Sequence, residues 1–469
     1  MWLLLAGLAC QTPTTETASD SSVQETGTPT DSASSPSDTQ AGTDSDPPPP
    51  PKEHHPNILM LSLDTIRASE IGRYSGLETT PFIDRLMDEG FTLEAHRSCS
   101  NWTYSAMVCA LGAGHLMDLG FIPETDDDPE SVIPYTTVPE DLVLFAERLA
   151  ARDYQSALFS ANGFVGGDFG TGRGYDTAEV RYSTSAEKLI EQGLEVFDET
   201  FDNERPWLFH IHFMDTHNPY NPPKEYLSPV RDLEPISWDF SRTDTLAEVE
   251  AVWHTLSEVE KELIRTHLDT RYRCALTYLN DQIESLFDAL SARKAMDDTV
   301  VVLFSDHGEQ FFEHGAAEHG NALYEEEGRT IGVFWGSGIE PYVEASLTSH
   351  RDLIPILYTL LEWDKTELPS WVSEEENDPD PIAHLLRWKE PGEGGGFSDT
   401  SREPLLAVVQ GDKKLIYHWS GTREYYDLAS DPDEQIELGA SVGWDSLDQA
   451  IDDDAQRLYE EFFPEHPPG

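Results

Sequence analysis

A carboxylate and an imidazole stand side by side at the end of an apolar run, which is an arrangement suited to metal binding. Asp306 and His307 come one residue after the run Thr299 to Phe304, whose composition is that of a buried strand. Such a pair offers two ligands of the types that Zn and Mn accept. The alternative is a structural pair that caps the next element. His314 and His319 follow in a turn rich in Glu and Gly, which is also ordinary for a solvated loop.

Two more aspartates stand at the ends of apolar runs elsewhere in the chain. The run Ile58 to Leu63 stops at Asp64, and the run Trp207 to Met214 stops at Asp215. Runs of this kind, alternating with helical patterns, predict an α/β fold with a doubly wound, mostly parallel sheet flanked by helices. Ligands of such a sheet bind outside the carboxyl ends of its strands. We therefore expect Asp64, Asp215 and Asp306 to be neighbours.

Helical periodicity connects these runs. It predicts helices from Thr80 and Pro81 onward, over Leu142 to Leu149, over Ala186 to Phe197, and from about Thr270. The segment Ile236 to Arg265 lies between two sheet units, and we interpret it as an insertion near the site or along its rim. The predicted organisation is a signal over residues 1–10, a disordered linker rich in Ser, Thr, Asp and Pro over 11–55, a catalytic domain over 56–365, and a small C-terminal subdomain with a short antiparallel sheet over 366–469.

The charge balance of the chain limits its partners. The 469 residues include 89 Asp and Glu against 30 Lys and Arg, a formal net charge of -59. Such a chain repels nucleic acid and anionic membrane surfaces. An anionic small molecule would be repelled as well, so a site for one needs its own local positive charge. A metal ion would supply that charge.

The first ten residues resemble a bacterial lipoprotein signal. A short apolar run ends in small residues before Cys10, and it is too short to span a bilayer. We expect an exported lipoprotein of the bacterial cell envelope, periplasmic or surface-facing, which meets the membrane only through a lipid anchor at Cys10. Cleavage as an ordinary secretory signal is the alternative. Among the three later cysteines, Cys99 and Cys109 are either bridged or buried as free thiols, and Cys274 is left over.

Several segments in register resemble the sulfatase family of the alkaline phosphatase superfamily, over roughly residues 56 to 440. They are Pro56 to Ala68, Tyr74 to Gly76, Thr80 to Leu86 with Glu89 and Gly90, Phe213 to Tyr220, Ser305 to Glu309, Glu313 to Gly315, His319 to Asn321, Arg351 to Pro355, Tyr426 to Leu428, and Asp431 with Pro432. The resemblance implies an alkaline phosphatase-like fold. It also implies that Asp64, Asp306 and His307 bind one divalent cation together with the nucleophile.

The resemblance places Thr103 in the nucleophile position. Sulfatases carry there a C-x-P-S-R motif, or its serine equivalent, whose first residue is oxidised to formylglycine. The corresponding residues here are Thr103, Ser105, Ala106 and Met107, and formylglycine cannot arise from threonine. Branches with an unmodified threonine, which include phosphodiesterases, phosphonate hydrolases and phosphoethanolamine transferases, attack phosphorus. Metal coordination favours the deprotonated hydroxyl. The alternative role of Thr103 is that of a helix N-cap.

Three further residues are candidates for substrate chemistry. His217 and His319 fall where related transferases place a second metal or a substrate-binding pair, and either could protonate a leaving oxygen. Each could instead be a core histidine. Arg67 could pair with an anionic substrate oxygen or form a salt bridge within its loop. The Lys-x-His segment by which many sulfatases hold sulfate is missing after the second strand, where Asn162 is a weaker polar substitute.

These features predict a metal-dependent ester hydrolase that cleaves phosphate or phosphonate esters through Thr103. The alternatives are a sulfuric ester hydrolase, a phosphoethanolamine-type transferase and a non-enzymatic surface binding protein. Two carboxylates, an imidazole and a hydroxyl favour Zn or Mn and tolerate Ca. The expected substrate is a small-molecule, glycan or lipid ester.

Overall fold

The computed structural model describes residues 54–121, 137–202, 204–370, 372, 383–387, 404–440, 443–462, 464 and 467–468. The expected signal and lipid anchor, and all but the last two residues of the expected linker, lie outside these ranges. Within them, no helix combines the length and the apolar character that crossing a membrane requires.

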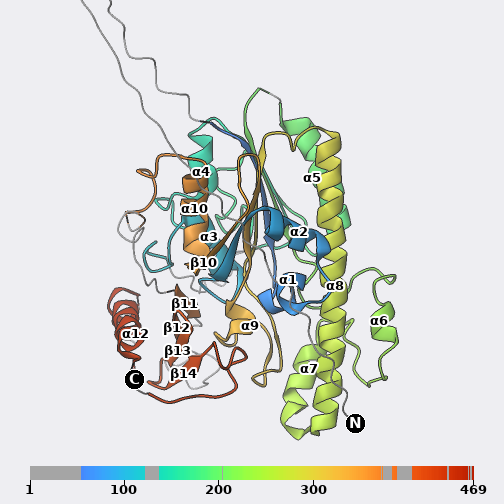
Figure 1. Ribbon diagram of the computed structural model, residues 1–469, viewed down its shortest axis with the longest axis vertical. Coiled ribbons are helices and arrows are strands. Elements are labelled where there is room, and N and C mark those ends of the chain that lie inside the picture. The colour runs from blue at the N-terminus through green and yellow to red at the C-terminus, as the bar shows by residue number, and fades with distance from the viewer. Residues whose placement is uncertain are drawn as a thin grey trace, which may run out of the picture. The chain divides into compact units, whose positions relative to one another are not determined.

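An eight-stranded sheet forms the centre of the fold (Figure 1). In pairing order its strands are β10 (Tyr342–Ser349), β2 (Phe91–Arg97), β9 (Gly332–Gly336), β6 (Thr299–Ser305), β1 (Asn57–Leu63), β5 (Trp207–Phe213), β3 (Gln155–Ser160) and β4 (Thr177–Val180). Strand β9 runs antiparallel to both of its neighbours, and the other pairs are parallel. The mostly parallel sheet predicted from the sequence is confirmed.

Helices cover both faces of this sheet. The side chains of β1 are therefore buried on both sides, which explains its almost continuously apolar sequence. Ile58 and Met60 belong to one hydrophobic core, whereas Leu59, Leu61 and Leu63 belong to the other. The first core includes α3 (Thr103–Gly112), α4 (Phe145–Ala150) and α10 (Leu353–Leu360). The second includes α2 (Pro81–Glu89), α5 (Ala186–Thr200) and α8 (Glu258–Ala292), which lie together in Figure 1. A strand buried on both faces needs apolar side chains at successive positions.

Two helices begin elsewhere than the periodicity predicts, because capping residues set the start. Helix α8 begins at Glu258 and not near Thr270, since Ser257 and Glu260 form a capping box. Helix α4 begins after Leu144, whose backbone N–H donates to the Glu147 carboxylate. The shorter helical elements are α1 (Gly72–Ser75), α6 (Ser228–Arg231), α7 (Thr245–Val252), α9 (Glu325–Gly328) and the 3-10 turns Ala68–Glu70, Trp253–Thr255 and His350–Asp352.

Part of the segment Ile236 to Arg265 is therefore helical, as α7 and the first turns of α8. The segment also touches the loop after β5, because Asn218 Nδ2 donates to the Thr243 carbonyl at 3.1 Å. Next to this loop, a two-stranded sheet pairs β7 (Gln310–Phe311) with β8 (Ala317–Glu318).

A second, antiparallel sheet forms the C-terminal subdomain. It consists of β11 (Ala383–Arg387), β12 (Leu405–Gln410), β13 (Lys413–His418) and β14 (Arg423–Asp427), followed by α12 (Asp445–Arg457) and a π turn (Leu458–Phe462). The fully buried Lys414 ammonium joins this sheet to α9, since it lies 3.1 Å from Glu325 and 3.0 Å from Glu434. The expected small antiparallel sheet is confirmed.

The two cysteines that flank Thr103 in the sequence are bonded to each other. A disulfide joins Cys99, just after β2, to Cys109 inside α3, with their Cα atoms 6.4 Å apart. Of the two alternatives left open by the sequence, the structure has the bridge. Cys274 is a buried free thiol in α8.

Candidate metal centre and active site

The sheet brings two distant aspartates to one edge. Asp64 directly follows β1 and Asp306 directly follows β6, and the two strands pair in parallel with Leu63 opposite Ser305. The Asp306 backbone N–H continues the ladder, donating to the Leu63 carbonyl at 3.1 Å. The carboxyl ends of adjacent parallel strands share an edge, so the side chains that follow them meet.

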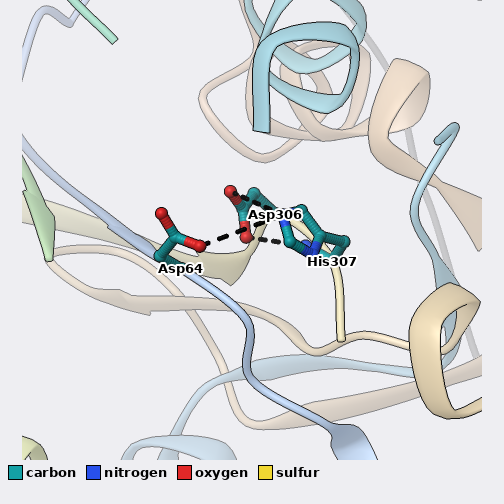
Figure 2. Close-up of side chains that lie close together, drawn as sticks. All are labelled: Asp64, Asp306 and His307. Carbon is teal, nitrogen blue, oxygen red and sulfur yellow. Dashed lines mark hydrogen bonds and ion pairs between the residues drawn. The ribbon is translucent and has the colours of Figure 1, made fainter. Parts of the chain in front are cut away.

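Asp64, Asp306 and His307 point toward one another at this edge (Figure 2). One ligand atom from each lies within 4.8 Å of the others. His307 Nε2 is 3.6 Å from Asp306 Oδ2 and 3.9 Å from Asp64 Oδ1. All three side chains are fully buried. Three of the four predicted ligands are therefore brought together within reach of one ion.

The hydrogen bonds around these residues leave one carboxylate oxygen of each aspartate without a donor from the described residues. Asp306 Oδ1 accepts from the backbone N–H of Thr65 at 3.1 Å and of His307 at 2.7 Å, whereas Asp306 Oδ2 accepts no hydrogen bond from the described residues. The same holds for Asp64, whose Oδ1 has no donor there. His307 Nδ1 lies 2.9 Å from the Gly308 carbonyl, so it carries the proton and leaves Nε2 as a ligand. This donor set fits a divalent cation.

The electrostatics of the site also call for positive charge. Burial, and next the Asp64 carboxylate, raise the pKa of Asp306 well above its usual range. Burial would raise the pKa of Asp64 too, but a hydrogen bond from His212 and the nearby His217 hold it well below its usual range. Burial lowers the pKa of His307, which is neutral as a metal ligand must be. Two carboxylates this close and this buried need a counter-charge.

Thr103 joins the cluster as the first residue of α3. Its Oγ1 lies 3.4 Å from His307 Nε2 and 3.2 Å from Asn162 Nδ2. Trp102, and not Thr103, occupies the N-cap position. The structure thus places the hydroxyl beside the three candidate ligands, at the N-terminus of a buried helix where negative charge on oxygen is favoured.

His217 and His319 border the same centre. The His319 ring centroid lies 4.4 Å from that of His307 and 5.0 Å from that of His217. His319 Nδ1 is 3.0 Å from Glu309 Oε1, and His217 Nδ1 is 2.9 Å from the Asn218 carbonyl. The two histidines therefore stand in contact at one side of the cluster.

Three other candidates form polar contacts with residues outside the cluster. Arg67 Nη1 lies 2.7 Å from Glu313 Oε1, which matches the salt-bridge alternative for this residue. His314 Nδ1 lies 2.6 Å from Glu326 Oε1. Asp215 accepts a 3.0 Å hydrogen bond from the backbone N–H of Ala186 at the start of α5, and burial raises its pKa to about 6.

Three contacts at the site were not predicted from the sequence. Asn162 Nδ2 lies 2.7 Å from Asp64 Oδ2, His212 Nε2 lies 3.3 Å from the same oxygen, and Glu309 holds His319. A signal for His212 exists, because His210 and His212 interrupt an otherwise apolar buried strand. Buried polar side chains in such a strand are rarely there for packing.

The comparison with known families agrees with this geometry. The family model described as Sulfatase matches residues 56–363, which is more than half of the chain. The chain belongs to the sulfatase family. The resemblance predicted from the motifs is confirmed.

Curated members of the sulfatase family match at low identity. A choline-sulfatase of Rhizobium meliloti is 24% identical over 284 residues, which cover 58% of this chain and 54% of the relative. A sulfatase of Formosa agariphila is 22% identical over 457 residues, which cover 84% of this chain and 85% of the relative. The chain thus spans about half the length of the first relative and most of the second.

Solved structures show the sulfatase fold in enzymes of two specificities. A 2-O GAG sulfatase matches with a TM-score of 0.61 at 16% identity, over 87% of this chain and 94% of that one. The phosphonate monoester hydrolase of Agrobacterium radiobacter matches with a TM-score of 0.61 at 15% identity, over 86% of this chain and 96% of that one. These likenesses confirm the fold, and they extend equally to enzymes of sulfur and of phosphorus.

Proposed function

We propose that this sulfatase-family protein is a metal-dependent hydrolase that cleaves phosphate or phosphonate esters, with Thr103 as the nucleophile. The observation that carries the proposal is the position of the Thr103 hydroxyl, 3.4 Å from His307 Nε2 and 3.2 Å from Asn162 Nδ2. It stands beside two carboxylates that each turn an unpartnered oxygen inward.

The proposed reaction has two displacements. In the first, Thr103 Oγ1 attacks phosphorus, the bond to the ester oxygen breaks, and the leaving alcohol takes a proton. In the second, water attacks the phosphorylated threonine, and its Oγ1 recovers a proton. A bound divalent cation would supply positive charge that favours the deprotonated threonine and offsets the charge of the substrate oxygens. Asn162 would donate its amide hydrogen to the same region.

His217 and His319 are proposed to protonate the leaving oxygen and to stabilise the transferred group. Their ring centroids are 5.0 Å apart, so one leaving group can meet both. Glu309 Oε1, 3.0 Å from His319 Nδ1, would fix the orientation of that ring. Arg67 remains a weaker candidate for substrate binding, since Glu313 already engages its guanidinium.

Asp64, Asp306, His307 and Thr103 are the proposed metal ligands, and we favour Zn or Mn. Two carboxylates, one imidazole and one hydroxyl make a small mixed O and N set, whereas Ca requires six to eight oxygens. The imidazole is the ligand that disfavours Ca.

Sulfate ester hydrolysis is the second candidate function, and the family match favours it. Two residues argue for phosphorus instead. Thr103 cannot become formylglycine, and Asn162 stands in the segment where many sulfatases carry Lys-x-His. A non-enzymatic surface protein is a weaker candidate, since the ligand cluster is intact. A phosphoethanolamine-type transferase would use the same cluster and remains an alternative.

The test is a substrate panel with matched variants. The purified protein, loaded separately with Zn, Mn and Ca, is assayed on 4-nitrophenyl sulfate, 4-nitrophenyl phosphate, bis(4-nitrophenyl) phosphate and a phenylphosphonate ester. We expect turnover of phosphorus esters, loss of at least about 10³-fold in kcat for Thr103→Ala, partial retention for Thr103→Ser, and no change for the exposed control Thr366→Ala. Full turnover by Thr103→Ala on every phosphorus ester contradicts the proposal, and faster sulfate hydrolysis selects the second candidate.

We further propose that the exported protein carries a lipid attached to Cys10 and acts on ester substrates at the cell envelope. Metabolic labelling with a fatty acid, compared between the native chain and Cys10→Ala, tests this part independently. Label retained by Cys10→Ala, or absent from both, contradicts it.

A further inference from the structure

A chain of buried hydrogen bonds leads away from the metal centre. From Asp64 Oδ2 it passes to His212 Nε2 at 3.3 Å, from His212 Nδ1 to Ser62 Oγ at 2.8 Å, from Ser62 Oγ to His210 Nε2 at 2.8 Å, and from His210 Nδ1 to the Tyr175 hydroxyl at 2.8 Å. The first four residues are fully buried, and Tyr175 is the half-buried end.

The register between β1 and β5 brings together the side chains that form these hydrogen bonds. Ser62 lies opposite His212 in the β1 and β5 pairing, and His210 is two residues earlier on β5, so both imidazoles share a sheet face with the serine. Tyr175 reaches His210 from the loop before β4. The side chains therefore occupy core positions where Val or Leu would otherwise pack.

With Asp64 ionised and both imidazoles neutral, the chemistry of the groups permits one direction of donation. An ionised Asp64 only accepts, so His212 Nε2 must donate to it, and His212 Nδ1 must then accept from the Ser62 hydroxyl. Ser62 Oγ in turn accepts from His210 Nε2–H, and His210 Nδ1 accepts from the Tyr175 hydroxyl. Burial and the neighbouring His212 lower the pKa of His210 to about 3, which matches the neutral ring that this order requires.

We propose that Ser62, His210 and Tyr175 are positioning residues that act through His212 to hold Asp64 Oδ2, so that Asp64 Oδ1 stays turned toward the cation. This inference rests on the metal site of the proposed function and not on the reaction. Asp64 Oδ2 receives donors from two sides, His212 and Asn162, while Oδ1 receives none. Outer partners of this kind orient a ligand and increase its affinity for metal.

The matched experiment removes one hydroxyl from each of two buried histidine contacts. Ser62→Ala breaks the chain, whereas Thr348→Val breaks the 3.0 Å contact between Thr348 Oγ1 and His96 Nδ1 at the opposite part of the sheet. Affinity for Zn²⁺ alone and Mn²⁺ alone is measured by competition with a chromophoric chelator, and unfolding of the metal-free variants is measured in urea.

We expect Ser62→Ala to weaken metal binding by about 10- to 100-fold, and Tyr175→Phe to weaken it less. Thr348→Val should lower the stability of the metal-free protein as Ser62→Ala does, with an unchanged Kd for metal. An unchanged Kd in Ser62→Ala, an equal loss in Thr348→Val, or a wild-type protein that binds neither ion overturns the inference. Absence of phosphorus ester turnover would contradict the proposed function but leave this order of affinities intact.

A second readout needs no metal. In selectively ¹⁵N-histidine-labelled metal-free protein, His210 and His212 should each carry their proton on Nε2, with assignments from His210→Gln and His212→Gln. A proton on Nδ1 of either ring reverses the direction of donation and overturns the inference.

Discussion

Asn162 Nδ2 lies 2.7 Å from Asp64 Oδ2, and the same nitrogen lies 3.2 Å from Thr103 Oγ1. One amide thus connects a proposed metal ligand to the proposed nucleophile. Strand β3 pairs with β5, and β5 pairs with β1. The loop after β3, which carries Asn162, therefore lies at the same edge of the sheet as Asp64.

Asn162→Ala should reduce kcat on a phosphorus ester by about 10²-fold. The variant removes a donor that stabilises negative charge near Thr103 and loosens one side of Asp64. Steady-state kinetics check this, with the exposed Asn221→Ala as control. Equal kcat for both variants would show that the amide does not act in the reaction.

Asp306→Asn should separate metal binding from folding. The two inward carboxylates repel each other when no cation is bound, so the neutral amide should leave the metal-free protein at least as stable as the native one at pH 7.5. Zn²⁺ at a thousandfold excess over its Kd should increase the free energy of unfolding of the native protein by about 4 kcal/mol and so raise its Tm. Asp306→Asn should abolish this rise in Tm. Calorimetry with and without EDTA measures both. A metal-free Asp306→Asn that is several degrees less stable would contradict the charge argument.

The disulfide should stabilise the nucleophile segment. Cys99 and Cys109 are ten positions apart, and closing such a loop contributes about 3 kcal/mol to the free energy of unfolding in the chain-entropy account. The double variant Cys99→Ala, Cys109→Ala should lose about that amount in urea denaturation and also turn over more slowly. Cys274→Ala is the control for loss of a buried sulfur. A double variant as stable as the control would mean that packing alone holds the segment.

Stability should depend on pH through Glu424. Burial would raise its pKa, but hydrogen bonds from His418, Tyr426 and Tyr324 lower it to about 2. Because the folded pKa lies below the ordinary 4.5, the stabilisation is full above pH 4.5 and is lost as the pH falls toward 2.

Glu424→Gln should therefore cost about 3 kcal/mol at pH 7 and progressively less below pH 4.5, as measured by urea denaturation. The exposed Glu340→Gln is the control and should show no such trend. A penalty for Glu424→Gln that stays constant down to pH 3 would rule out the ionised carboxylate as its source.

The sequence is sufficient to predict that the candidate metal ligands Asp64 and Asp306 meet, because both stand at strand ends. Asp64 and Asp306 each close a long apolar run, and the geometry of parallel strands places such ends together whatever the intervening sequence. The mostly parallel sheet follows from the same runs. For this reason the sequence alone predicts that two residues far apart in the chain share one site.

Side-chain partners are harder to predict from the sequence, since they depend on rotamers and on helices and loops that are distant in the sequence. Arg67 is adjacent to the site in sequence, yet Glu313 from the β7 to β8 turn engages its guanidinium. Apolar periodicity places the start of α8 too late because the first turns of the helix are rich in Glu and carry few apolar residues. The capping box at Ser257 fixes the boundary instead. Whether Cys99 meets Cys109 depends on how α3 docks after β2.

Strand β11 lies beyond the segment that the family model matches, yet it supports the nucleophile loop. Leu386 donates its N–H to the Cys99 carbonyl at 2.9 Å, and its own carbonyl accepts from Ser100 Oγ at 2.7 Å. The segment that the family model matches therefore depends on a strand that follows it in the chain. A substitution in β11 could shift Thr103 without replacing any of the proposed site residues.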